Sequence, residues 1–292
     1  MAWVDVTCAP MQIHTTIVAF RQSLAVERAA GRTVGVVPTM GFLHAGHMSL
    51  IEQAARDCDA VVVTVFVNPL QFAPGEDLSA YPRDPEGDAA KAAATGATML
   101  FAPAADEMYP EPVLTTVSVA GVSGTMEGAA RPTLFSGVAT VVAKLFSIVG
   151  QSRAYFGEKD FQQLAVVRAM ARDLSIPVEV VGCPIVREPD GLALSSRNVY
   201  LTPEGRRAAP VLRRALAAGS ELIVGGVTDA DEIRRSMAAV VRLEPEADLD
   251  YVEVADPLTL TPLTVCDSSA RLLIAARFGR ARLIDNISAG QR

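Results

Sequence analysis

Two histidines stand three residues apart in a turn that is rich in glycine. His44 and His47 belong to the segment Val-Pro-Thr-Met-Gly-Phe-Leu-His-Ala-Gly-His, and the whole chain has only three histidines. An apolar, β-branched run at 33–37 precedes this segment, and apolar residues with helical spacing follow it at 48–55. The imidazoles are therefore predicted at a strand-to-helix turn. Free N–H groups and the helix dipole favour an anion at such a place, and we expect a phosphate.

Two other interpretations of this turn stay open. A His-x-x-His pair on one helix face could bind zinc, but such a site needs a third protein ligand and usually has a glutamate beside the first histidine. Ala45 occupies that place, and His14 is the only other histidine in the sequence. A purely structural turn is the second alternative. Packing in the core is a poor explanation for two polar rings in a loop with glycines.

A second candidate segment, Gly-Glu-Lys-Asp-Phe-Gln-Gln at 157–163, lies between a predicted strand and a predicted helix. Lys159 is placed where an ammonium group could neutralise phosphate oxygens. Asp160 could cap the helix or hold ribose hydroxyls, and the sequence does not choose between these roles. Gln163 follows about one helical turn later, so its side chain can point to the same side as that of Asp160.

A third segment, Asp-Gly-Leu-Ala-Leu-Ser-Ser-Arg-Asn at 190–198, suits a loop that wraps phosphates. Ser195 and Ser196 could donate hydrogen bonds through hydroxyl and backbone groups, and Arg197 could bind through its planar guanidinium. A segment of this kind is usually an ordinary surface turn, so it gains weight only beside the histidine turn. We expect the loop to close over a nucleotide and to exclude water.

The three segments supply cationic and neutral hydrogen-bond donors but no evident covalent nucleophile. Neither the Walker pattern ending in Gly-Lys-Ser/Thr nor a Gly-x-Ser-x-Gly elbow occurs in the sequence. Such a site suits nucleotidyl transfer, in which a substrate oxygen attacks the α-phosphorus of ATP and pyrophosphate leaves. Catalysis would then consist of alignment and of stabilising charge on the phosphate oxygens.

Alternating strand-like and helix-like segments must position these residues. Apolar, β-branched runs predict strands at 34–37, 60–66, 98–102, 115–119, 154–156 and 178–181. Helical spacing predicts helices between many of them, at 48–56, 85–95, 135–149 and 160–174. This order is typical of an α/β fold with a Rossmann-like, mostly parallel sheet and helices on both faces. Ligands of such sheets bind beyond the carboxyl ends of the strands, where the histidine turn and the segments 66–71 and 156–160 should meet.

The sequence changes in character after about residue 182. Helices rich in arginine and alanine are predicted at 203–216 and 229–243, and strands at 250–254, 271–278 and 282–287. We therefore predict two domains. Residues 1–184 would form the Rossmann-like domain, and residues 185–292 a smaller α+β domain that closes over the nucleotide.

Composition limits the possible functions. The chain has 292 residues, half of them hydrophobic, which is enough for a substantial core. The net charge is −7 and no block rich in lysine or arginine appears, so a broad nucleic-acid-binding face is not expected. No run of eighteen apolar residues indicates a membrane span, and the four cysteines lack C-x-x-C spacing. We expect a cytoplasmic protein whose partners are small molecules.

Five motifs in order give the sequence a family resemblance. They are Val-Pro-Thr-Met-Gly with His-x-Gly-His, Phe-Val-Asn-Pro-x-Gln-Phe, Tyr-Pro-Arg, Phe-Gly-Glu-Lys-Asp-x-Gln-Gln, and Arg-Glu-x-Asp-Gly-Leu-Ala-x-Ser-Ser-Arg-Asn. From about 11 to 288 the chain resembles the pantothenate synthetase (pantoate–β-alanine ligase) family of the nucleotidyltransferase superfamily. The resemblance implies that pantoate and ATP form pantoyl adenylate and pyrophosphate, after which β-alanine displaces AMP to give pantothenate. It also implies Mg²⁺, carried mainly by the ATP phosphates, and a homodimer.

The resemblance further assigns roles to residues of this sequence. The catalytic residues would be His44, His47, Lys159, Ser195, Ser196 and Arg197. His47 would donate a proton, and Lys159 would bridge the α-phosphate and pantoate. The ATP site would consist of Pro38, Thr39, Met40, Gly41, Phe42, Leu43, His44, Ala45, Gly46, His47, Gly157, Glu158, Lys159, Asp160, Val186, Leu194, Ser195, Ser196 and Arg197. The substrate pocket would contain Met40, Gln71, Gln163 and Arg131, and Asp88 is the candidate magnesium ligand.

Two positions depart from the family pattern, and two other functions remain as alternatives. Leu134 stands where members often have histidine, which removes a possible donor, and Leu194 replaces a methionine of similar bulk. Another adenylyltransferase of the same fold would act on a different small acid or phosphate and stop at a nucleotide-capped product. A catalytically dead nucleotide-binding regulator would have lost key cations, yet the imidazoles, Lys159 and Arg197 are all present.

Overall fold

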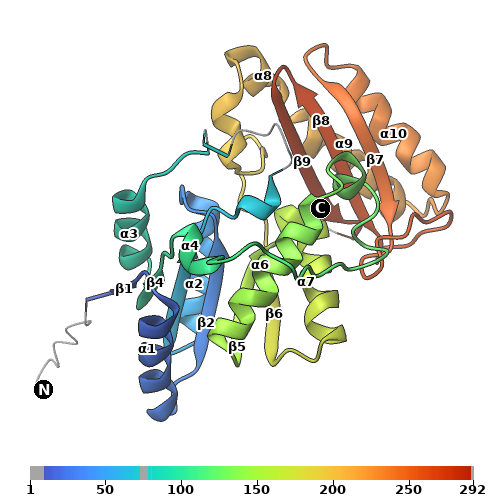
Figure 1. Ribbon diagram of the computed structural model, residues 1–292. Coiled ribbons are helices and arrows are strands. Elements are labelled where there is room, and N and C mark those ends of the chain that lie inside the picture. The colour runs from blue at the N-terminus through green and yellow to red at the C-terminus, as the bar shows by residue number, and fades with distance from the viewer. Residues whose placement is uncertain (1–9, 73–77, 80, 291–292) are drawn as a thin grey trace, which may run out of the picture.

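The structure has two layers of secondary structure. A six-stranded sheet forms the centre of the first layer. The computed structural model describes residues 10–72, 78–79 and 81–290 (Figure 1). The strands lie in the order β1-β4-β3-β2-β5-β6, and every neighbouring pair is parallel. Their bounds are β1 (Gln12–His14), β2 (Val34–Thr39), β3 (Ala60–Val65), β4 (Met99–Phe101), β5 (Ser152–Gly157) and β6 (Val178–Cys183).

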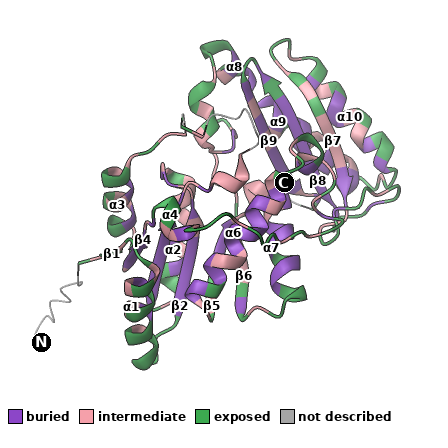
Figure 2. Cartoon of the chain, in the orientation of Figure 1, coloured by how far each residue is buried: buried purple, intermediate pink, exposed green. Residues whose placement is uncertain are grey.

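Helices cover both faces of this sheet, because its central strands are apolar on both sides. Successive strand residues point to opposite faces, so Val36 and Val62 join one core cluster while Val37 and Val63 join another. On the first face lie α1 (Ile17–Ala29), α6 (Leu134–Val149) and α7 (Phe161–Asp173). On the second lie α2 (Ala45–Asp57) and α3 (Pro85–Ala94). Figure 2 shows the buried strands between the partly exposed helices.

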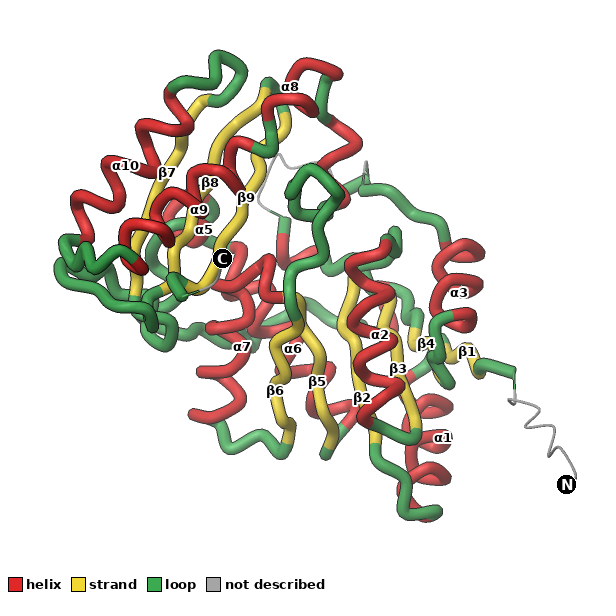
Figure 3. Tube along the Cα trace, turned by 180° about the vertical axis from the view of Figure 1, so that it is seen from behind, coloured by secondary structure: helices red, strands yellow, loops and turns green. Residues whose placement is uncertain are grey.

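A second layer follows at the C-terminal end. It is an antiparallel sheet in the order β7-β8-β9, formed by β7 (Asp248–Ala255), β8 (Arg271–Phe278) and β9 (Ala281–Ser288). The helices α9 (Val211–Val224) and α10 (Ala230–Arg242) pack on one face, around Leu272 and Ile274. From the other face Leu273 and Tyr251 pack on the core of the first layer. Figures 1 and 3 show the antiparallel sheet with α9 and α10 at one end of the molecule and the parallel sheet at the other.

Short helices connect these elements. They are η1 (Pro69–Gln71), α4 (Ala105–Met108), α5 (Glu127–Ala130), η2 (Glu158–Asp160), η3 (Ser196–Tyr200) and α8 (Pro203–Ala208). Three of them, η1, η2 and η3, carry residues that the sequence analysis placed in the ligand site.

The predicted fold class is confirmed, since a parallel sheet with helices on both faces precedes a smaller layer of helices and antiparallel strands. The division into domains at 184 and 185 stays a prediction. One predicted strand is wrong: residues 115–119 form a loop. Val117 donates its backbone N–H to Thr140 Oγ1 of α6, 2.9 Å away, and both Val117 and Val119 pack on the core. The alternating apolar residues at 115–119 therefore belong to a loop that covers the core.

Two further differences concern helices. The predicted helix at 203–216 is interrupted between α8 and α9, because Pro210 lacks the N–H that a continuous helix would need. The sequence analysis missed β1 and α1. Thr16 caps α1 by accepting a hydrogen bond from the N–H of Ala19, and Phe20 and Leu24 bury one face of the helix.

Gly137 of α6 allows α6 to lie close to η1. A larger residue at this position is therefore predicted to lower the stability of the protein. A Cβ atom at this position would lie 2.1 Å from the backbone oxygen of Leu70, so backbone would have to move. We expect Gly137→Ala to lower the free energy of unfolding by about 1–3 kcal/mol, which thermal denaturation can measure. Gly157→Ala is the control, because its Cβ would meet nothing within 4 Å. Equal melting temperatures for the two variants would contradict the prediction.

Candidate active site

The strand order places the candidate segments at one edge of the large sheet. The chain proceeds from β2 to β3 on one side and from β5 to β6 on the other, and β2 and β5 are neighbours. The loops that follow these two strands therefore diverge and leave a crevice at their carboxyl ends. The histidine turn follows β2, and the Lys159 turn follows β5.

A cleft of about 800 Å³ opens at this edge and brings the three segments together. The predicted site residues that line it are Pro38, Thr39, Met40, His44, Gly46, His47, Gln71, Arg131, Gly157, Lys159, Asp160, Gln163, Val186, Leu194, Ser195, Ser196 and Arg197. The remaining predicted residues do not belong to the described lining: Gly41, Phe42, Leu43, Ala45, Asp88 and Glu158. The contact of each residue with a ligand stays a prediction.

The two histidines form the first turn of α2 and cap it. His44 is the N-cap residue, and its Nδ1 accepts a hydrogen bond from the N–H of Gly46 at 3.1 Å. His47 Nδ1 accepts from the N–H of His44 at 3.4 Å. Because Nδ1 is the acceptor in both neutral rings, each proton sits on Nε2, which is thereby a hydrogen-bond donor. The caps therefore leave two N–H donors for an anion at the helix N-terminus.

Burial keeps both imidazoles neutral. Desolvation, followed by the neighbouring His44, lowers the pKa of His47 to about 3. Desolvation and then the positive charge of Lys159 lower the pKa of His44. The ring centroids lie 4.1 Å apart, so two charged imidazoles would also repel each other. In the free protein at neutral pH these rings donate hydrogen bonds as neutral groups.

Asp88 holds the residues that precede the histidines. Its carboxylate is buried, with 1% of the residue exposed. It accepts hydrogen bonds from the backbone N–H groups of Phe42 and Leu43, at 2.8 and 2.7 Å. Phe42 has φ of 53° and Gly41 has φ of 86°, so this turn needs such an external support. Both carboxylate oxygens thus hold the backbone of the turn, and Asp88 does not belong to the described lining of the cleft, so its role as a magnesium ligand stays a prediction.

Asn68 anchors η1 and thereby Gln71. This fully buried amide donates to Gly137 O and Gln71 Oε1, and it accepts from the N–H of Leu70 and the hydroxyl of Tyr109. All of its hydrogen-bonding capacity is used, so its orientation is determined. The sequence analysis noted the Asn-Pro motif but did not name Asn68. A polar residue three positions after a buried strand was the available signal.

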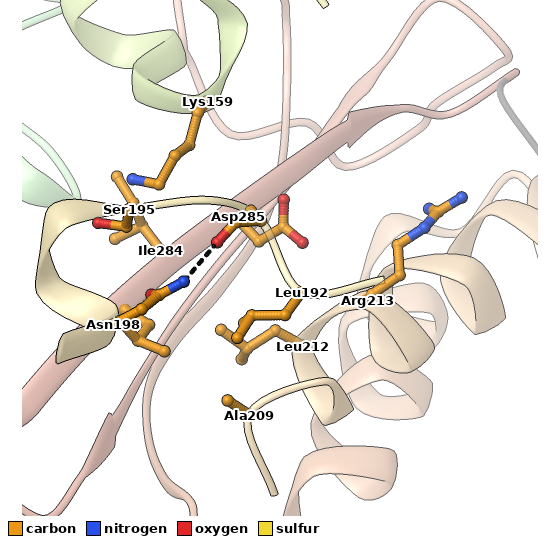
Figure 4. Close-up of a pocket in the computed structure, with 11 residues that line it drawn as sticks. Lys159, Leu192, Ser195, Asn198, Ala209, Leu212, Arg213, Ile284 and Asp285 are labelled. Atoms are coloured by element: carbon orange, nitrogen blue, oxygen red, sulfur yellow. Dashed lines mark hydrogen bonds between the residues drawn. The ribbon is translucent and has the colours of Figure 1, made fainter. Parts of the chain in front are cut away.

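Lys159 extends from η2 into the cleft. Its side chain is 15% exposed, and Nζ lies 3.6 Å from Asp160 Oδ1. Together with Ser195 and Asp285 it also lines a small pocket of about 10 Å³, shown in Figure 4, where Asn198 Nδ2 donates to Ala193 O. Lys159 and the serine loop are thus neighbours across a narrow space.

The loop before η3 is a short hairpin. The N–H of Leu194 donates to Val186 O at 2.9 Å, and Arg187 and Ala193 form a β-bridge. Ser195 caps η3 by accepting from the N–H of Arg197 at 3.2 Å. The hairpin brings Val186, which the family resemblance assigns to the ATP site, beside the serines predicted to hold the phosphates.

One wall of the cleft is apolar. It is formed by side chains of α6 and of the strand ends: Phe66, Leu134, Phe135, Val138, Val141, Val142, Leu145 and Phe156. At the rim Arg282 of β9 makes two hydrogen bonds with Glu127 of α5, at 2.5 and 2.8 Å. This ion pair joins the two layers. The sequence analysis missed it because its partners lie 155 positions apart.

The described residues offer no cluster of three or more His, Cys, Asp or Glu side chains that could hold a metal ion. The zinc interpretation of the histidine pair thus finds no third ligand in the described part of the chain. None of the helices within the described ranges is long and apolar enough to cross a membrane.

Comparison with known proteins agrees with this geometry. The family model "Pantoate-beta-alanine ligase" matches residues 12–288. The chain belongs to the pantoate–β-alanine ligase family. A pantothenate synthetase of Chloroflexus aurantiacus is 52% identical over 277 residues, covering 94% of this chain and 97% of the relative. Another, from Thermus thermophilus, is 54% identical over 278 residues, covering 95% and 99% of the two chains.

Solved structures of the family have the same fold. The crystal structure of a pantothenate synthetase from Thermus thermophilus matches with a TM-score of 0.90 at 52% identity, covering 96% of this chain and all of that one. A pantoate–β-alanine ligase from Francisella tularensis, solved in complex with β,γ-ATP and β-alanine, matches with a TM-score of 0.77 at 31% identity, covering 97% and 99%. The family resemblance predicted from the five motifs is confirmed.

The role of Asp88 can be tested by Asp88→Asn. The amide keeps one acceptor and turns its NH₂ group toward a backbone N–H, which leaves a buried donor unpaired. We expect a loss of about 1–3 kcal/mol in the free energy of unfolding, measured by denaturant titration. The control is Asp84→Asn, the N-cap of the same helix, because asparagine caps equally well. A raised Mg²⁺ requirement with unchanged stability would instead identify Asp88 as a metal ligand.

The low pKa of His47 predicts how stability depends on pH. The unfolded chain has an ordinary histidine pKa of 6.5, whereas the folded value is about 3. Between these values the unfolded state binds more protons, so His47 makes the folded protein less stable as pH falls below 6.5. We expect His47→Gln to flatten the slope of the melting temperature between about pH 5 and pH 7, measured by scanning calorimetry. Parallel slopes in the variant and the wild type would contradict this.

Proposed function

We propose that the protein catalyses the ATP-dependent condensation of pantoate with β-alanine to give pantothenate, AMP and pyrophosphate through a bound pantoyl adenylate. The observation that carries the proposal is the cleft in which the histidine turn, Lys159 and the loop 195–197 meet. Membership of the pantoate–β-alanine ligase family supports the choice of substrates.

The first step is attack of a pantoate carboxylate oxygen on the α-phosphorus of ATP. A P–O bond to the carboxylate forms as the bond to the β-phosphate oxygen breaks, and pyrophosphate leaves with the electron pair. His44 and His47 donate from Nε2 to phosphate oxygens, and Lys159 neutralises charge between the α-phosphate and pantoate. Ser195, Ser196 and Arg197 hold the leaving phosphates. Bound phosphate would raise the pKa of His47, which favours its role as a proton donor.

The second step is attack of the β-alanine amine on the acyl carbon of the adenylate. The C–N bond forms, the bond from the acyl carbon to the AMP oxygen breaks, and the amine loses a proton. Gln71, Gln163, Met40 and Arg131 are proposed to hold the acid, and the apolar wall accommodates its aliphatic part. We infer that closure of the loop over ATP keeps water from the adenylate.

Magnesium, dimerisation and location complete the proposal. Mg²⁺ binds with few protein oxygens when phosphates and water fill its coordination sphere. That mode fits this cleft, where Glu127 and Asp285 are already paired with arginines. We propose a homodimer, as the family resemblance implies, and a cytoplasmic location, as expected from the composition of the sequence. Most of the helix α6 packs on its own sheet, so its apolar face is explained without an interface.

The amine requirement separates this function from the alternative of another adenylyltransferase. With pantoate, ATP and Mg²⁺, purified protein should release AMP at a substantial rate only after β-alanine is added, as chromatography of the nucleotides can show. The His47→Ala variant is the control, and it should form adenylate roughly 10²–10³ times more slowly. Pyrophosphate release that needs no pantoate, or AMP release that ignores β-alanine, would rule the ligase assignment out.

A further inference from the structure

Two neighbouring residues of β9 hold two different parts of the cleft. Asp285 and Asn286 are 4% and 2% exposed, and side chains of successive strand residues point to opposite faces. Asp285 accepts a hydrogen bond from each of the two guanidinium NH₂ groups of Arg187, at 2.7 and 2.9 Å. Arg187 also donates to Gly191 O at 3.0 Å, within the loop that leads to the serines.

Asn286 holds the turn that carries Lys159. Its Nδ2 donates to Glu158 O at 3.0 Å and to Lys159 O at 2.9 Å. The turn η2 is one short 3-10 helix that leads directly into α7, and the Asn286 amide adds hydrogen bonds from the second layer to two of its carbonyl groups. A side chain from the second layer therefore determines the backbone position of Lys159.

The orientation of the Asn286 amide is itself determined. Arg271 donates from Nε to Asn286 Oδ1 at 2.8 Å and from NH₂ to Glu158 Oε2 at 3.1 Å. Its guanidinium also lies 4.0 Å from the centroid of the Phe161 ring. Because the amide oxygen must face Arg271, the amide nitrogen must face the carbonyl groups of η2.

We propose that Asn286 is a positioning residue for Lys159 and sets where the ammonium group meets the reacting phosphate. The inference rests on the proposed function, in which Lys159 acts on the α-phosphate. A lysine has a long, flexible side chain, so a shift of its Cα moves the whole range that Nζ can reach. A misplacement of about 1 Å in a reacting geometry can lower a rate by roughly 10²-fold.

The variant Asn286→Asp tests this with little change of shape. It keeps the acceptor for Arg271 but turns an oxygen, in place of NH₂, toward the two carbonyl groups of η2. We expect kcat for pantoate-dependent pyrophosphate release to fall roughly 10- to 100-fold. The KM for ATP, which the loop 195–197 mainly sets, should change less than about 3-fold, measured at a temperature where thermal denaturation shows that the variant is folded.

A double variant shows whether the effect passes through Lys159. In a Lys159→Met background, Asn286→Asp should lower the remaining rate by less than about 3-fold, since effects on one shared group are not additive. Ile287→Val is the matched control: it loosens the same strand in the core of the second layer and should leave kcat within about 2-fold. If Asn286→Asp folds poorly, Asn286→Ala replaces it in both backgrounds.

The outcomes separate the inference from the function on which it rests. A near-normal kcat in Asn286→Asp with an active wild type would overturn the inference alone. An equal loss in the wild-type and Lys159→Met backgrounds would do the same, because Asn286 would then act on something other than Lys159. A wild type that releases no pantoate-dependent pyrophosphate would overturn the proposed function instead.

Discussion

The parallel pairing of β2 with β5 is the constraint on which the rest of the site depends. Val36 lies opposite Ala154 in this pair, so both strands reach the same edge of the sheet before their chains turn in opposite directions. One turn begins a long helix whose N-terminus presents two imidazoles, and the other is a single turn that presents an ammonium group. A register shift here would separate two groups that must act on one phosphate, whatever else in the fold was kept.

Acidic side chains at the cleft are paired with cations, which suits the polyanionic nucleotide of the proposed reaction. Glu158 is paired with Arg271, Asp285 with Arg187, and Glu127 with Arg282. Each pair is partly or fully buried, so its carboxylate exerts little repulsion on a ligand. The net charge of −7 is thus a property of the outer surface, and the site offers local donors that are neutral or positive.

The sequence predicted those parts of the site that lie in short contiguous motifs. His44, His47, Lys159 and the serine loop each follow a recognisable strand or turn, and the parallel topology then explains why they meet. It did not predict Asn68, Asn286 or the pair of Glu127 and Arg282, since these act on distant backbone or across the two layers, and no local pattern encodes a partner 69, 127 or 155 residues away. For Asp88 the sequence predicted a metal ligand, because an acidic residue near a phosphate site suggests a metal, and it did not predict that the carboxylate supports a strained turn.

The ion pair between Glu127 and Arg282 bears on how molecules enter and leave. Both side chains are largely buried, at 12% and 16% exposure. Swinging the whole second layer outward on a hinge would separate these two charges and break the ion pair. Opening the hairpin at 186–194 alone keeps this pair intact, but it would separate Arg187 from the buried carboxylate of Asp285. Either movement would therefore break an ion pair, and each route into the cleft carries its own electrostatic cost.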